Sequence, residues 1–257
     1  MKYLLICSAA FLTSGLTLFS GFGLGTLLLP VFALFFAMEV AVGLTAVVHF
    51  LNNLFKLGLV GRQADRQVVM RLGIPAILAS FFGASLLVWL ADVGPLAQYQ
   101  AFGRDLYVTP VKLAVGVLMI LFALMEVVPV LEKLSFDRKC LPLGGVLTGF
   151  FGGVSGHQGA LRSAFLIRCG LSKEAFIGTG VVVACLVDFT RLGVYAAKFP
   201  AAELRANAAL LTAASVSAFL GAWAGSRLIH KVTMRAVQWT VAVMLFVIAL
   251  GLAAGII

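Results

Sequence analysis

An internal repeat restricts the possible folds of this chain more than any other feature of its sequence. Residues 147–193 match residues 12–58 without a gap. Leucine meets leucine easily in an apolar chain, but polar matches in one frame are harder to obtain by chance. These are Glu39 with Glu174, Asn53 with Asp188, and Lys56 with Arg191. A duplication at a fixed offset indicates a repeat architecture, and in a membrane protein it is typical of transporters.

The composition is that of a membrane protein. Hydrophobic residues make up 62% of the chain and charged residues 11%, against about 25% charged residues in soluble domains. The net charge of +9 does not indicate nucleic-acid binding, because the basic residues lie in short loops between apolar runs. Basic loops of this kind determine topology and stay on the cytoplasmic side of the membrane.

Apolar runs long enough to span a bilayer occur at 4–36, 39–60, 72–91, 111–131, 141–169, 173–197, 206–229 and 236–257. The first run of each half is longer than one membrane-spanning helix needs, and it is interrupted by glycines, at 20–25 and at 152–159. About 15 residues on either side of a break give about 22 Å of helix, less than the roughly 30 Å hydrocarbon core. We therefore expect each interrupted run to form a hairpin of two half-length helices.

The positive charges favour hairpins that do not cross the membrane. Basic loops near Arg66 and Arg138 should be cytoplasmic, and the balanced loop 92–110 should lie outside. If the run 141–169 folds back, the basic loops near Lys173 and Lys231 are also cytoplasmic, whereas a single crossing would export both. Lys2 alone argues the other way. The predicted fold is therefore all-α and polytopic, with two inverted repeats, 1–131 and 141–257, joined by a cytoplasmic linker at 132–140.

Two features near the start and along the chain have plain interpretations. Residues 1–11 resemble a secretory signal, but the repeat begins inside the same apolar run, so we interpret the segment as part of the mature protein. The four cysteines show no metal-ligand spacing and are interpreted as small apolar residues of the interior: Cys7, Cys140, Cys169 and Cys185. No cofactor, metal or catalytic residue is predicted.

The functional site is expected where the two glycine-rich breaks face each other near the middle of the bilayer. In transporters with inverted repeats, broken helices meet there and their exposed N-termini hold anionic groups. Backbone N–H groups freed at the breaks would bind the anion, and side chains would add donors. The candidate substrate-binding residues are Ser20, Gly21, Gly23, Gly25, Thr26, Ser155, Gly156, His157, Gln158, Gly159, Arg162 and Ser163.

Arg162 lies one turn after the second break and allows two interpretations. An arginine within the hydrocarbon costs about 2.5–3.5 kcal/mol on insertion scales, so it needs a carboxylate, an anionic substrate or water. It either pairs or reaches the interface for structural reasons, or it binds the transported anion. His49 and His157 likewise are either satisfied interior histidines or functional groups, with His157 at the break better placed for function. Glu39 and Glu174 are interpreted as residues at helix starts, where a carboxylate is favoured.

A second polar group follows each break and is assigned to coupling or gating. It consists of His49, Asn52, Asn53, Lys56, Asp188 and Arg191. The first four share one helical face by their spacing, and the last two lie one turn apart. Asp188 and Arg191 form a structural ion pair in one interpretation. In the other, Asp188 accepts a proton and Arg191 is free for substrate, which would couple transport to the proton gradient.

The sequence resembles the sulfite exporter TauE/SafE family of bacterial inner-membrane transporters over nearly its whole length. The resemblance is carried by residues 20–25 (Ser-Gly-Phe-Gly-Leu-Gly) with Pro30, and by residues 153–156 (Gly-Val-Ser-Gly). It implies transport of small sulfur-containing or organic anions without a bound cofactor. The second motif departs from the family pattern, because His157 and Arg162 occur in a segment that lacks its usual glycines and proline. This departure indicates a subgroup with a different or more demanding anion.

The sequence thus predicts a multi-pass carrier in the bacterial inner membrane that moves a small anion by alternating access. Its partners would be the anion and the lipid bilayer, with no nucleic acid and with a homodimer left open. The alternative is a passive channel for a small anion or neutral solute. An intramembrane enzyme lacks a credible acid–base or metal set, and a scaffold subunit would not need the internal symmetry.

Overall fold

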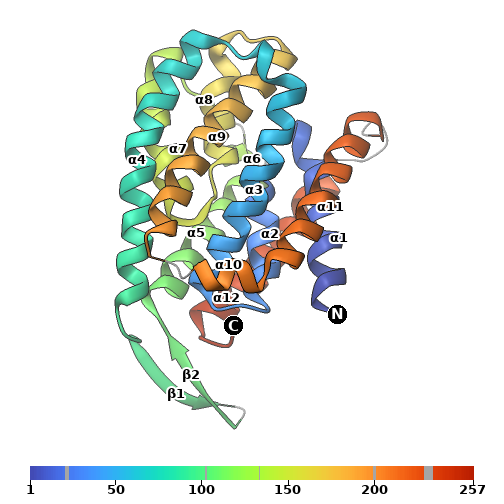
Figure 1. Cartoon of the computed structure of the whole chain (residues 1–257). Helices are drawn as coiled ribbons and strands as arrows, with labels where there is room; N and C mark the ends of the chain where they lie inside the picture. The colour runs from blue at the N-terminus through green and yellow to red at the C-terminus, as the bar shows by residue number, and fades with distance from the viewer. Residues whose placement is uncertain (21–22, 102, 133, 199–200, 229–233) are drawn as a thin grey trace.

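The computed structural model describes residues 1–20, 23–101, 103–132, 134–198, 201–228 and 234–257, and is mostly helical (Figure 1). The elements of the first half are α1 (Lys2–Ser20), α2 (Leu24–Ala33), α3 (Met38–Val60), η1 (Gly61–Gln63), α4 (Arg66–Asp92), β1 (Ala97–Ala101), β2 (Arg104–Val108), α5 (Pro110–Val127) and α6 (Pro129–Glu132). Those of the second half are η2 (Arg138–Cys140), α7 (Leu141–Ser155), α8 (Gly159–Leu166), η3 (Ile167–Cys169), α9 (Lys173–Ala196), α10 (Ala201–Ala206), α11 (Ala208–Leu228) and α12 (Met234–Ala253).

By length and composition, four helical segments among the described residues can cross a membrane. They are Met38–Gln63, Arg66–Asp92, Lys173–Ala196 and Ala208–Gly225. Shorter apolar helices accompany them at Lys2–Thr17, Leu24–Ala33, Pro110–Met125 and Ala242–Ala253. The chain is therefore a multi-pass, all-α membrane protein, as the apolar runs predicted.

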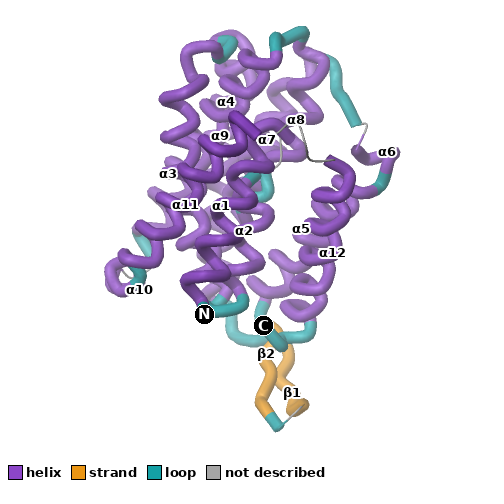
Figure 2. The backbone as a smooth tube through the Cα atoms, turned by 90° about the vertical axis from the view of Figure 1, so that its right-hand side faces the viewer, coloured by secondary structure: helices purple, strands orange, loops and turns teal. Residues whose placement is uncertain are grey.

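Each of the two interrupted runs folds back on itself as a helical hairpin. In the first, the Lys2 ammonium group lies 5.4 Å from the ring centroid of Phe36, so the start of α1 lies close to the segment that follows α2. In the second, Phe136 N–H donates to the Ala164 carbonyl at 3.1 Å, and the rings of Phe136 and Phe165 stack with centroids 4.4 Å apart. The first hairpin opens at the end of the bundle that holds the C-terminus, and the second at the opposite end (Figures 1 and 2).

The hairpins differ from the expected shape because their arms are unequal. α1 has 19 residues and α2 only 10, while α7 has 15 and α8 only 8. The second arm of the second hairpin is short because α8 passes into η3, which ends at Gly170 in a left-handed conformation. The arms were expected to be about equal on either side of the break, and that expectation was wrong.

Glycines allow helices of opposite halves to pack with their backbones in contact. Gly149 and Gly153 of α7 face α4, where an added Cβ would lie 2.1 Å from the Ala76 carbonyl oxygen and 2.4 Å from that of Ser80. Between α1 and α11, a Cβ on Gly221 would lie 2.0 Å from the Phe11 carbonyl oxygen. Small residues four apart commonly form such close interfaces in membranes. The hairpin of each half is thereby held against the other half.

We expect Gly149→Ala to destabilise the protein, because its new methyl group would overlap the backbone of Ala76. Forcing two packed helices apart costs about 1–3 kcal/mol, which lowers the melting temperature by about 5 °C in a chain of this size. The matched control is Gly193→Ala on α9, where nothing lies within 4 Å of the added Cβ. Thermal unfolding of the purified variants in detergent checks this. Equal melting temperatures for the two variants would contradict the packing argument.

Helix starts follow local capping rules. Glu39 and Glu174 lie in the first turns of α3 and α9, as expected. α4 begins at Arg66, earlier than the apolar run at 72–91 suggested, because the Asp65 carboxylate accepts from Val68 N–H at 2.9 Å and caps the helix. The loop 92–110 contains an antiparallel hairpin of β1 and β2, which was not expected from the sequence.

The apolar core has two parts. The larger part joins buried residues of α2, α3, α5, α11 and α12, with Leu28, Phe32 and Leu44 fully buried among them. The smaller part joins α4, α7, α8 and α9 around Leu72 and Phe165. Buried polar side chains gather on α3, on α9 and at the second break, and they form the site described next.

Candidate functional site

The two helix breaks lie against each other, as the repeat predicted. The carbonyl oxygen of Gly156 is 3.4 Å from the position that a Cβ would take on Gly25, and 3.9 Å from that on Gly23. Gly156 ends α7 with a φ of 80°, a left-handed conformation that favours glycine. The helix resumes at Gly159. In the first half, α2 begins after Gly23. Gly21 lies outside the described residues, and the side chain of Ser20 is not described.

A fully buried carboxylate, Asp188, organises the polar groups around the breaks. Its Oδ2 lies 2.6 Å from Nδ1 of His49 and accepts from Nδ2 of Asn53 at 2.9 Å. Its Oδ1 accepts from Nε of Arg191 at 3.0 Å and from Nε2 of Gln158 at 3.4 Å. Arg191 Nη2 is 2.8 Å from the same oxygen. Side chains from α3, from α9 and from the second break therefore converge on one negative charge.

The guanidinium group of Arg191 limits the space for a side chain at Gly156, in the second break. It is fully buried, and its Nη1 has no hydrogen-bond partner among the described residues. A Cβ on Gly156 would lie 2.5 Å from this Nη1. Position 156 thus requires glycine for two reasons, the positive φ and the guanidinium group against it.

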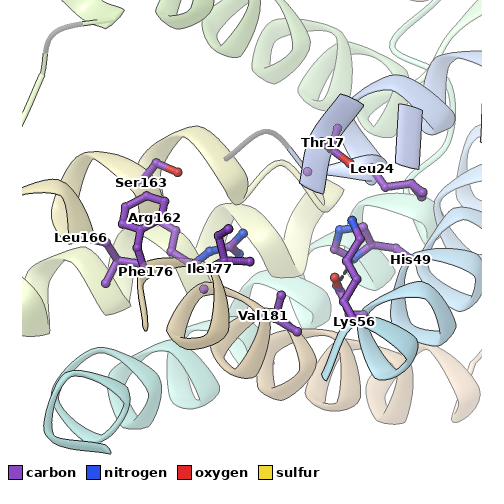
Figure 3. Close-up of a pocket in the computed structure, with 13 residues that line it drawn as sticks. Thr17, Leu24, His49, Lys56, Arg162, Ser163, Leu166, Phe176, Ile177 and Val181 are labelled. Atoms are coloured by element: carbon purple, nitrogen blue, oxygen red, sulfur yellow. Dashed lines mark hydrogen bonds between the residues drawn. The ribbon is translucent and has the colours of Figure 1, made fainter. Parts of the chain in front are cut away.

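A small cavity of about 40 Å³ lies beside this cluster, between α1, α2, α3, α8 and α9. Figure 3 shows Arg162 and Ser163 projecting from α8 on one side, and His49 and Lys56 from α3 on the other. Thr17 and Asn53 complete the polar lining, and Leu24, Leu166, Phe176, Ile177 and Val181 form apolar walls. Of these lining residues, Ser163, Phe176 and Ile177 are half-buried.

Two basic side chains that line the cavity lack a carboxylate partner. Lys56 is 5% exposed and has no hydrogen bond or ion pair among the described residues. Arg162 is 9% exposed and donates to Oε1 of Gln158 at 3.2 Å, again without an ion pair in the described part of the chain. Among the side chains that the structure describes, Asp188 is the one buried carboxylate, and Arg191 and His49 already occupy it. Basic side chains therefore outnumber carboxylates around the cavity, which favours an anion.

The cavity lining includes residues that were predicted for two different roles. Of the substrate-binding candidates, Gly23, Arg162 and Ser163 line the cavity, while three coupling candidates, His49, Asn53 and Lys56, line it as well. The rest lie elsewhere. Thr26, Ser155, Gly156 and Gly159 are buried outside the cavity lining, Gln158 bridges Arg162 and Asp188, and Asn52 accepts from Ser14 at 2.9 Å.

His157 is not part of the cavity lining. Its Nδ1 lies 2.9 Å from Oγ of Ser155, and its ring stacks on Phe122 of α5 with centroids 5.4 Å apart. The interior histidine is thus held by packing on one face and by a hydroxyl group at its edge. The apolar walls could not be recognised from the sequence, because Phe176, Ile177 and Val181 have the same helical spacing as residues that face lipid.

These observations define a multi-pass helical membrane protein whose two broken helices meet beside a buried, positively charged cavity. The family model of the sulfite exporter TauE/SafE matches residues 6–252. The chain therefore belongs to this family of membrane anion transporters, which confirms the resemblance seen in its motifs. Searches of curated proteins and of solved structures found no significant match.

Proposed function

We propose that the protein is a secondary transporter in the bacterial inner membrane that carries a small anion by alternating access and draws on the proton gradient. The observation that carries this proposal is the pair of buried cations, Lys56 and Arg162, which line one cavity without a carboxylate partner. An anion in the cavity would neutralise both, and would remove much of the cost of burying them.

The size and lining of the cavity support a small sulfur-containing or organic anion. A cavity needs about 10–15 Å³ of internal volume to hold one water molecule. A cavity of about 40 Å³ therefore holds about three waters or an anion with few non-hydrogen atoms. Lys56 and Arg162 suit the oxygens of a sulfite or sulfonate group. The apolar side chains of Phe176 and Val181 would accept a short apolar substituent.

The arrangement of the two halves supports alternating access. Asn53 and Asp188, which correspond in the sequence repeat, hydrogen-bond directly to each other at 2.9 Å. The two hairpins open at opposite ends of the bundle (Figures 1 and 2). We take 1–131 and 141–257 as inverted repeats related by an axis near this contact, with 132–140 as a cytoplasmic linker. In such transporters one repeat moves against the other around a fixed site.

Accumulation against a gradient tests this function. Purified protein in proteoliposomes with a pH gradient is expected to concentrate radiolabelled sulfite or sulfoacetate above the outside level. The alternative, a passive channel through the same breaks, would only equilibrate the label. Empty liposomes provide the control for leakage. Equilibration without accumulation, or no uptake of either anion, would contradict the proposal.

A further inference from the structure

We propose that Asp188 and His49 form the proton-binding site of the transport cycle, and that a proton moves across the membrane in the same direction as the anion. This inference rests on the proposed function and specifies its driving ion. Its structural basis is a buried imidazole–carboxylate pair in which the imidazole also lines the anion cavity.

His49 is placed to carry a proton between the cavity and the carboxylate. Its Nδ1 lies 2.6 Å from Oδ2 of Asp188. Its Nε2 is on the other edge of the ring, 3.6 Å from the position that a Cβ would take on Gly23, a residue of the cavity lining. A hydronium ion in the cavity gives its proton to Nε2 and becomes water, while Nδ1 releases its proton to Asp188. The result is a neutral histidine and a neutral carboxylic acid, and the reverse steps return the proton.

The groups that face Asp188 are mostly cationic. Arg162 on α8 and Arg191 on α9 act on Asp188 itself, and Lys56 on α3 acts on its partner His49. Cys185 and Tyr195 on α9 are further titratable neighbours of Asp188 among the described residues. α7 contains no acidic or basic residue, and those of α4 lie at or near its ends: Arg66, Arg71 and Asp92. Protonation of Asp188 therefore removes the one buried carboxylate charge among the described side chains, and makes the surroundings of the cavity more positive by one unit.

This change links the proton to the anion. An anion at Lys56 and Arg162 favours the more positive, protonated site, and by reciprocity a protonated Asp188 strengthens anion binding. Gln158 joins the two sites directly, since its Nε2 donates to Asp188 at 3.4 Å and its Oε1 accepts from Arg162 at 3.2 Å. The loaded carrier thus holds both ligands, and the empty carrier holds neither, which is the requirement for cotransport.

The sequence repeat offers a matched variant for testing this site. Asn53 and Asp188 correspond in the repeat and hydrogen-bond to each other, and Asn53 Nδ2 is also 3.1 Å from Nδ1 of His49. The double variant Asn53→Asp/Asp188→Asn moves the carboxylate across this contact and keeps it within reach of His49. Asp188→Asn alone keeps the shape of the side chain and removes the carboxylate.

The experiment measures protons and anions together in proteoliposomes that contain a pH-sensitive dye and receive radiolabelled sulfite at alkaline pH. In the unsubstituted protein, sulfite influx is expected to acidify the interior. Asp188→Asn is expected to lose sulfite accumulation driven by the pH gradient, with a lower ratio of protons to sulfite and a smaller effect on sulfite exchange. The double variant is expected to recover part of that ratio. Thermal unfolding of each variant identifies any that fail to fold.

The outcomes separate this inference from the proposed function. An unchanged proton-to-sulfite ratio in Asp188→Asn means that protons travel on the anion itself, and overturns the inference. A folded double variant with no better ratio than Asp188→Asn does the same. Sulfite transport without any proton movement in the unsubstituted protein overturns the inference but leaves the transport function intact. A protein that transports no anion contradicts the proposed function.

Discussion

Replacement of Lys56 by methionine is expected to weaken anion binding about 10- to 100-fold. A hydrogen bond to a charged group contributes about 1.5–3 kcal/mol, and each 1.4 kcal/mol is about tenfold in affinity. Methionine keeps most of the length of the side chain and removes the buried charge. In the absence of anion, Lys56→Met is therefore expected to be as stable as the unsubstituted protein or more stable, because an unpaired buried cation has been removed.

Calorimetric titration of the purified protein with sulfite measures this effect, and melting temperatures with and without sulfite provide a second readout. The control is Lys139→Met, which removes a charge of the same sign from an exposed position in η2. Arg162→Met is expected to weaken binding to a similar extent. If Lys56→Met binds sulfite as tightly as Lys139→Met does, Lys56 is no part of the anion site.

Replacement of Asp188 by leucine is expected to produce the largest loss of stability. Removal of one partner from a buried ion pair costs about 3–5 kcal/mol, because the other charge is left uncompensated. Here the guanidinium of Arg191 would lose its carboxylate, and the donors of His49, Asn53 and Gln158 would lose their acceptor. The melting temperature should fall by about 10 °C.

Two further variants distinguish the loss of charge pairing from the loss of shape. Asp188→Asn keeps an acceptor oxygen and is expected to be less destabilised than Asp188→Leu. The double variant Asp188→Leu/Arg191→Met removes both charges of the pair, so it should recover part of the stability lost in Asp188→Leu. Scanning fluorimetry in detergent gives the melting temperatures. If Asp188→Leu melts at the same temperature as the unsubstituted protein, Asp188 does not hold the cluster together.

The sequence predicted those features of the fold that depend on local patterns. Apolar runs located most of the helices, because a membrane requires about 20 apolar residues for each span. The glycines at 20–25 and 152–159 indicated where the helices break, because few other residues tolerate the backbone conformation of a helix break. Helical spacing also predicted one polar face of His49, Asn52, Asn53 and Lys56. All of these except Asn52, which accepts from Ser14, line the cavity.

Contacts between distant segments could not be predicted in the same way. Spacing paired Asp188 with Arg191, but His49 and Asn53 reach the same carboxylate from α3, which depends on how α3 packs against α9. Because contacts between distant segments do not follow from spacing, the positions of Lys56 and His157 relative to the cavity also could not be predicted. Lys56, a candidate for coupling or gating, lines the cavity, whereas His157, a candidate for substrate binding, stacks on Phe122 of α5. The sequence alone does not show which side of a break faces the cavity.

A structure determined with selenite tests the central claim most directly, because selenite has the shape and charge of sulfite and its selenium atom is located by anomalous scattering. We predict one selenium site in the cavity, with selenite oxygens at about 3 Å from Nζ of Lys56 and from a guanidinium nitrogen of Arg162. An empty cavity at saturating selenite, or selenium sites only outside the cavity, would contradict the account.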